Sequence, residues 1–168
     1  MIGKKTLVDL AKRQKKLDNY IYEKKQIKFS NQISNKKMIA FFVELGEFIN
    51  EERSFKFWSQ KPASPRNVLL EEYIDGLHFI LSIGLEIGFD FENFESDNLS
   101  KQETLEQEYL QLISFFSQYS LSKDSNNFTI LMNSFFKIGS WFDFSEQELL
   151  DTYFRKNEIN FKRQENQY

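Results

Sequence analysis

Apolar residues recur along this chain at helical spacing, and the pattern predicts a protein built from α-helices. In residues 6–25, Leu7, Leu10 and Leu17 are three and seven positions apart, so they share one face of an amphipathic helix. Further helices are expected at residues 35–58, 65–88, 101–119, 127–142 and 145–157, followed by a polar tail at 158–168. The predicted fold class is all-α, a bundle of about six helices in one domain spanning residues 1–168.

Proline and capping residues set the expected helix boundaries. The two prolines of the chain, Pro62 and Pro65, break it between the second and third helices, and Pro65 suits a first helical position. Ser34 is expected to cap the second helix and Ser64 the third. Ser145 has a Glu three residues later, which is the capping-box pattern for the sixth helix.

Two pairs of carboxylates lie near the centres of the second and third helices, which are apolar on almost every side and are expected to pack centrally and antiparallel. Glu44 and Glu47 are three residues apart, as are Glu72 and Asp75, so each pair shares a helix face. Neither helix has a Lys or Arg near its centre. Ionised carboxylates gathered in an apolar setting cost several kcal/mol and repel one another. A site between these helices for two hard divalent cations, Mg²⁺ or Mn²⁺, would remove that cost. Carboxylates on a solvated helix face are the alternative.

Composition narrows the class of function. The 168 residues carry 22 basic and 25 acidic side chains, a net charge of −3, so charge does not favour direct binding to nucleic acid. No apolar run approaches the ~20 residues of a membrane span, and no secretory signal is recognisable, so we expect a cytoplasmic protein. The absence of Cys and the single His exclude zinc–thiolate sites and a di-iron bundle with several histidines. A carboxylate cluster with Mg²⁺ instead suits phosphoryl chemistry.

The carboxylate motif also carries a family resemblance. The pattern E-x-x-E, 24 residues, E-x-x-D resembles the all-α nucleoside triphosphate pyrophosphohydrolase superfamily. The stretches 44–58 and 71–86 are similar to the dimeric all-α dUTPases, and so is the C-terminal run from Tyr153 to Tyr168. Residues 89–150 contribute little to the likeness.

The resemblance implies a homodimer that hydrolyses dUTP, and also dUDP, to dUMP with Mg²⁺, limiting uracil incorporation into DNA and supplying dUMP. It assigns Glu44, Glu47, Glu72 and Asp75 to metal binding, with Glu44 or Glu47 also orienting the attacking water; Arg53, Lys56, Lys156, Asn160 and Arg163 to phosphate binding; and Gln14, Asp18, Trp58 and His78 to the base. The lone His78 and Trp58 also suit structural roles.

The residue patterns also fit other functions. Relatives with the same metal pattern act on dCTP, on several NTPs or on phosphoribosyl-ATP, and the pattern fixes the metal rather than the base. An alternative of another class is a non-catalytic helical binding protein, and a regulatory protein is a candidate partner if the chain is phage-encoded. Part of the aromatic set on the fourth and fifth helices is expected at a dimer interface: Phe115, Phe116, Tyr119, Phe128, Phe135, Phe136, Trp141 and Phe142.

Overall fold

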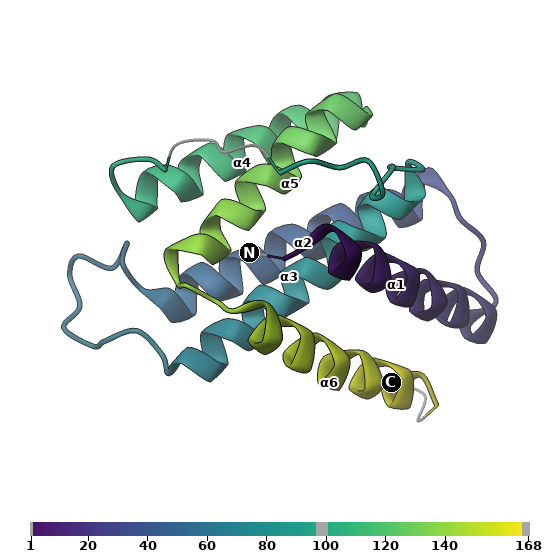
Figure 1. Cartoon of the computed structure of the whole chain (residues 1–168), viewed down its shortest axis with the longest axis horizontal. Coiled ribbons are helices and arrows are strands. Elements are labelled where there is room, and N and C mark those ends of the chain that lie inside the picture. Colours follow the sequence, from purple (N-terminus) through teal and green to yellow (C-terminus); the bar gives the residue numbers. More distant parts are fainter. Residues whose placement is uncertain (1, 97–100, 166–168) are drawn as a thin grey trace.

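The computed structural model describes residues 2–96 and 101–165, and the regular structure in these ranges is helical (Figure 1). The helices are α1 (Lys4–Lys25), α2 (Asn31–Glu52), α3 (Arg66–Glu86), α4 (Leu105–Ser122), α5 (Ser125–Trp141) and α6 (Glu146–Glu165). No strand occurs in the described residues. The prediction of an all-α bundle of about six helices is therefore confirmed.

Helix α3 lies at the centre of the bundle. It packs against α1, α2, α5 and α6, while α4 pairs with α5 (Figure 1). The helix is apolar on nearly every side, and Leu77, Ile80 and Leu81 are fully buried within it. In Figure 1, α2 and α3 run side by side, with α1 and α6 below them and the α4–α5 hairpin above. The predicted central position is confirmed for α3.

Helix α2 is less central than its sequence predicted. Its buried side chains, which include Phe41, Leu45 and Phe48, form one stripe at spacings of four and three. On the other side of the helix, Ile39 is 63% exposed and Val43 47% exposed. Neighbouring helices of the chain therefore cover only part of the circumference of α2, although the helix is apolar on almost every side.

The ends of α2 also differ from the prediction. The helix begins at Asn31, because the Ser30 hydroxyl, rather than that of Ser34, accepts a hydrogen bond from the Ile33 N–H and caps it. It ends at Glu52 instead of residue 58, because Arg53 adopts a left-handed backbone conformation with φ of 75°. Residues 53–65 thus form a long connection to α3.

At the start of α3, Pro65 stands at the N-cap, one position before the helix. Ser64, the expected cap, instead donates a hydrogen bond from its hydroxyl to the Glu51 carboxylate. The residue pattern thus identified the break in the chain correctly but misplaced the cap by one residue.

Helix α6 is longer than predicted. Its capping box is confirmed, since the Ser145 N–H donates to the Glu148 carboxylate at 2.8 Å and the Glu148 N–H donates to the Ser145 hydroxyl at 3.2 Å. The helix then continues to Glu165, and Phe161 packs against Tyr20 of α1. The expected polar tail is therefore helical through residue 165. Tyr168, the end of the family-like run, lies outside the described residues.

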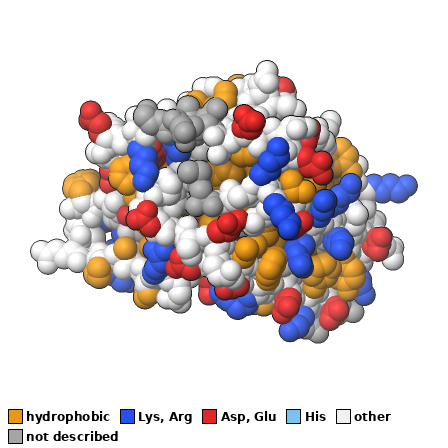
Figure 2. Space-filling model, viewed as in Figure 1, with side chains coloured by type: hydrophobic (Ala, Val, Ile, Leu, Met, Phe, Trp, Pro, Cys, Tyr) orange, Lys and Arg blue, Asp and Glu red, His pale blue; other side chains and the backbone are white. Residues whose placement is uncertain are grey.

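Charge is unevenly distributed over the surface. Figure 2 shows Lys and Arg side chains gathered over the end of the molecule where α1 lies, although the whole chain has a net charge of −3. Among the described helices, none combines the length and the apolar character needed to cross a bilayer.

Candidate active site

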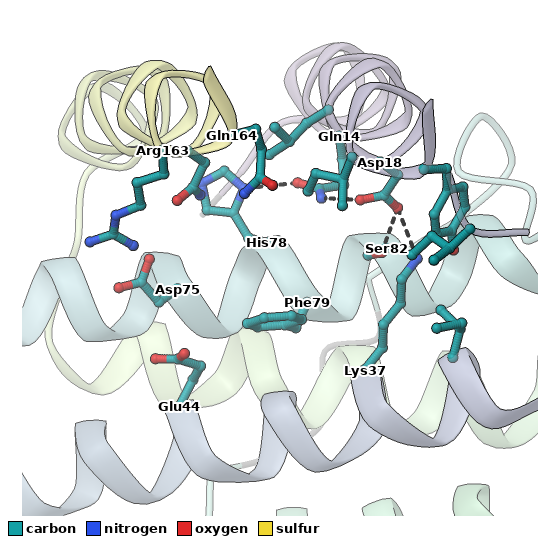
Figure 3. A pocket seen from close by; sticks show the side chains of 16 residues that line it. Gln14, Asp18, Lys37, Glu44, Asp75, His78, Phe79, Ser82, Arg163 and Gln164 are labelled. Carbon is teal, nitrogen blue, oxygen red and sulfur yellow. Dashed lines mark hydrogen bonds and ion pairs between the residues drawn. The ribbon is translucent and has the colours of Figure 1, made fainter. Parts of the chain in front are cut away.

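A cavity of about 350 Å³ lies between α1, α2, α3 and α6 (Figure 3). Seven of the residues singled out in the sequence line it: Gln14, Asp18, Glu44, Asp75, His78, Asn160 and Arg163. Carboxylates stand at one end, where α2 and α3 face α6, and an amide, an imidazole and a further carboxylate stand at the other. The fold thus brings together candidate groups that are distant in sequence.

Glu44 and Asp75 line the acidic end of the cavity, and Glu72 completes a cluster with them although it does not line the cavity. Each offers a carboxylate oxygen, and these atoms all lie within 4.8 Å of one another. The antiparallel pairing of α2 and α3 produces this arrangement, because it places the centre of one helix beside the centre of the other. Donor groups that are all carboxylate oxygens fit a hard cation such as Mg²⁺ or Mn²⁺.

Glu47 lies apart from this group. It is exposed, and in the described part of the chain it is not among the carboxylates close enough to share one ion. Its charge nevertheless raises the pKa of Glu44 and of Glu72, in each case after burial and the charge of Asp75. Glu47 therefore lies near enough to act on the cluster electrostatically, and its role as a metal ligand stays a prediction.

The cluster is electrostatically strained. Burial, followed by repulsion from Asp75, Glu47 and Glu72, raises the pKa of Glu44 from 4.5 to about 7. Burial is also the largest cause of the raised pKa values of Glu72 and Asp75. The group therefore favours uptake of positive charge, whether as protons or as a cation.

Helix α6 supplies positive charge to this end of the cavity. The Lys156 ammonium lies 2.5 Å from the Asp75 carboxylate, and the charge of Arg163 also lowers the Asp75 pKa, against the larger effect of burial. Asn160 lies between them in the sequence and lines the cavity. No local pattern within the two acidic helices indicates this ion pair, because Lys156 lies on α6, far from Asp75 in the sequence. The three residues share one face of α6, as their spacing of four and three predicted.

The opposite end of the cavity holds a buried polar network. Gln14 donates from Nε2 to Asp18 at 2.7 Å, and its Oε1 lies 2.8 Å from His78 Nδ1. The Tyr153 hydroxyl donates to the same Oε1 at 3.0 Å. Gln14, His78 and Tyr153 are all buried, so the predicted base-binding residues Gln14, Asp18 and His78 form one connected group.

Further polar residues of this end were missed in the sequence. Asp18 accepts hydrogen bonds from Ser82 at 2.5 Å and from Lys37 at 3.2 Å, and Lys37 also pairs with Glu86 at 2.7 Å. The sequence spacing of Lys37 and Ser82 could have indicated that they belong to the site. Lys37 lies seven residues before Glu44, and Ser82 seven residues after Asp75, so each continues the helix face that carries a cluster carboxylate.

Three predicted site residues lie away from the cavity, in the connection between α2 and α3. Arg53 donates to the Ser59 hydroxyl at 2.8 Å, and Lys56 donates to the Asn50 side chain at 2.6 Å. Trp58 is 66% exposed and packs against neighbouring Phe rings. None of the three lines the cavity, so the structure does not bring them together with the other candidates, and their substrate contacts stay predictions.

The fold and this site define a helical protein with a carboxylate cluster at one end of a cavity and a polar network at the other. Comparison with known protein families matches residues 6–168 to the dUTPase family. The chain therefore belongs to the dUTPase family, which indicates that it is an enzyme with dUTP diphosphatase activity. No curated protein matches the chain significantly.

Proposed function

We propose that this dUTPase hydrolyses dUTP, and also dUDP, to dUMP in the cavity between α1, α2, α3 and α6. The observation that carries the proposal is the convergence of Glu44, Glu72 and Asp75 within 4.8 Å, beside cations from α6. In this proposal these residues and Glu47 would hold Mg²⁺, which would supply charge neutralisation at the phosphates and lower the pKa of a bound water molecule. Mn²⁺ would be a substitute.

The chain's own carboxylates also orient the attacking water. Glu44 is the favoured group for this role, because it is half-buried and lines the cavity beside Asp75. A carboxylate oxygen accepts a hydrogen bond from water and so aligns it for attack on a phosphorus atom. Glu47, one helical turn further along α2, is the alternative.

The phosphates are expected to lie against α6. Lys156 and Arg163 supply positive charge, and Asn160 adds a neutral donor, on the helix face that meets the acidic cluster. Arg53, Lys56 and Trp58 are proposed as additional contacts. Because they do not line the cavity, these contacts require the connection between α2 and α3 to change position when substrate binds.

The base is expected at the polar end, against Gln14, Asp18 and His78. A buried pocket with directional polar groups rejects a base that leaves those groups unpaired, by up to ~10⁴-fold in kcat/KM. This end of the cavity is therefore proposed as the source of uracil selectivity over cytosine.

A homodimer is the proposed assembly, with each chain forming one domain. The exposed residues Ile39, Phe42, Val43 and Gly46 recur at spacings of three, one and three and form an apolar stripe along α2. A side chain added at Gly46 would meet nothing within 4 Å, so a second helix has room to approach there.

Three of the eight aromatic residues predicted for the interface are enclosed by their own chain. Tyr119, Phe128 and Phe135 are buried inside one chain, so they are not available to a partner. Phe116, which is half-buried, stacks on Phe42 and adjoins the exposed stripe.

Turnover of dUTP, dUDP, dCTP, dTTP and ATP, measured as dUMP or other monophosphate formed, tests the proposed function. We expect dUTP and dUDP to be hydrolysed to dUMP with Mg²⁺, and no turnover in excess chelator. Glu44→Gln should abolish hydrolysis, whereas Glu23→Gln, a change at an exposed carboxylate on α1, should not. Full activity in chelator would refute the metal-dependent reaction, and equal rates for dUTP and dCTP would favour a broader nucleotide pyrophosphohydrolase.

A further inference from the structure

The hydrogen-bond network around Gln14 determines which ring nitrogen of His78 carries a proton. Asp18 lies 2.7 Å from Gln14 Nε2, and a carboxylate oxygen accepts hydrogen bonds, so the Gln14 amide nitrogen must face it. The Gln14 carbonyl oxygen then faces His78 Nδ1 at 2.8 Å. Because a carbonyl oxygen only accepts, His78 Nδ1 must donate and therefore carries the proton.

The other ring nitrogen of His78 is consequently a bare acceptor. Burial, followed by the charge of Lys156, lowers the His78 pKa to about 3, so the ring is neutral at physiological pH. With the proton on Nδ1, Nε2 presents a lone pair. His78 is 5% exposed and lines the cavity, and its Nε2 has no hydrogen-bond partner among the described residues.

A buried acceptor without a partner costs free energy, and a ligand that donates to it removes this cost. Gln164 Oε1 is a second buried acceptor in the same cavity that lacks a partner among the described residues. Two such acceptors disfavour an anionic group at this end and favour a ligand with an N–H.

We propose that His78 Nε2 accepts the N3–H of uracil, and that Tyr153 is a positioning residue that holds His78 in the required tautomer through Gln14. This inference rests on the proposed function, because it places the base of dUTP at the polar end of the cavity. Uracil and cytosine differ at this atom, since N3 of uracil carries a hydrogen and N3 of cytosine carries a lone pair. A lone pair on His78 Nε2 therefore attracts uracil and repels cytosine.

Tyr153 suits the positioning role in two ways. Its hydroxyl lies 3.0 Å from Gln14 Oε1, with the Leu10 carbonyl as a second acceptor at 3.3 Å, so it donates toward the oxygen that must face His78. Its ring also stacks on the His78 ring, with centroids 4.1 Å apart and planes inclined by 22°. Asp18 accepts a hydrogen bond from the Gln14 amide nitrogen, and Tyr153 donates one to the Gln14 amide oxygen, so the two residues together fix the orientation of the amide.

The single histidine of the chain allows a direct spectroscopic test. In ¹⁵N-histidine-labelled full-length protein at pH 7, we expect a neutral ring with the proton on Nδ1. Addition of dUMP should move the Nε2 resonance in the direction of a hydrogen-bonded acceptor, and dCMP should leave it in place. A proton on Nε2, a charged ring, or the same response to both nucleotides would overturn the proposal.

Kinetics of Tyr153→Phe test the positioning role while keeping the stacked ring. The ratio of kcat/KM for dUTP to that for dCTP should fall roughly ten-fold, because Gln14 and His78 lose a constraint. The ratio for dUTP to dTTP should not change, because thymine has the same N3–H as uracil. A general loss of structure would lower kcat/KM for all three substrates and leave both ratios unchanged, whereas a generally loosened pocket would lower both ratios. Either result contradicts the proposal.

Tyr20→Phe is the matched control. Tyr20 also lies where α1 meets α6, its ring packs on Phe161, and it does not line the cavity. Both ratios should stay at their original values in this variant. Failure of the unmodified protein to hydrolyse dUTP would refute the proposed function itself, whereas the spectra with dUMP and dCMP decide the acceptor role of His78 separately.

Discussion

Replacing Glu44 with Gln should stabilise the metal-free protein while removing its activity. Burial and neighbouring carboxylates raise the Glu44 pKa from 4.5 to about 7 in the folded chain. A carboxyl whose pKa is raised by folding stabilises the fold fully below its unfolded value, and this contribution is lost as the pH rises through the folded value. Ionised Glu44 therefore opposes folding at pH 8 and not at pH 4.

The size of this effect follows from the pKa change. At about 1.4 kcal/mol per pKa unit, a rise from 4.5 to about 7 sets an upper bound of roughly 3 kcal/mol on the cost at high pH. Because the side chain is only half-buried, water screens its charge, and we expect roughly 1–2 kcal/mol. For a chain of this size that corresponds to a rise in melting temperature of about 3–6 °C.

Thermal unfolding in excess chelator at pH 4.5 and pH 8 measures this effect. Glu44→Gln should melt above the unmodified protein at pH 8 and close to it at pH 4.5. Added Mg²⁺ should raise the melting temperature of the unmodified protein more than that of the variant, because a ligand stabilises the state that binds it. Glu23→Gln, at an exposed carboxylate outside the cluster, serves as the control. If Glu44→Gln melts at or below the unmodified protein at pH 8, the description of the cluster as electrostatically strained is wrong.

Three further predictions concern packing, assembly and substrate binding. Gly84→Ala should cost about 2–3 kcal/mol in a urea titration, because the added carbon would lie 2.7 Å from buried Phe rings, including that of Phe128. Ile39→Lys should give a light-scattering mass near the 20.2 kDa of one chain, whereas the unmodified protein should give about twice that value; equal masses for both proteins would refute the α2 interface. Arg163→Glu should lower kcat/KM for dUTP by roughly ten-fold or more by placing negative charge beside the phosphates, whereas the same change at the exposed Lys162 should have little effect; similar losses in both variants would contradict a specific role for Arg163.

The hydrophobic pattern predicted the helices well because each helix has a continuous apolar stripe of its own. Helix ends were predicted less well, because they depend on single backbone conformations and on tertiary contacts. The left-handed turn at Arg53 has no Gly or Asn to indicate it. The extension of α6 beyond residue 157 is supported by the packing of Phe161 on Tyr20, a contact between the two ends of the chain.

In the candidate site, too, local features were predicted from the sequence and contacts between distant segments were not. Glu44, Glu72 and Asp75 were found from spacing alone, because both helices that carry them belong to one local hairpin. The ion pair between Lys156 and Asp75 and the bond between Gln14 and Tyr153 join distant segments, so no local pattern indicates them. Family resemblance identified Lys156 and Gln14 but did not reveal which side chains they contact.

The two ends of the cavity differ in when they become complete during synthesis. The acidic cluster needs residues 44–75, whose helices pair locally, and local contacts form early in folding. The polar network needs Gln14 and Tyr153, which are 139 residues apart. At ~5–20 residues per second, the chain between Asp75 and Tyr153 takes roughly 4–16 s to synthesise. During that interval the nascent chain has its carboxylates but lacks the last helix, so we expect the acidic cluster to form before the polar network.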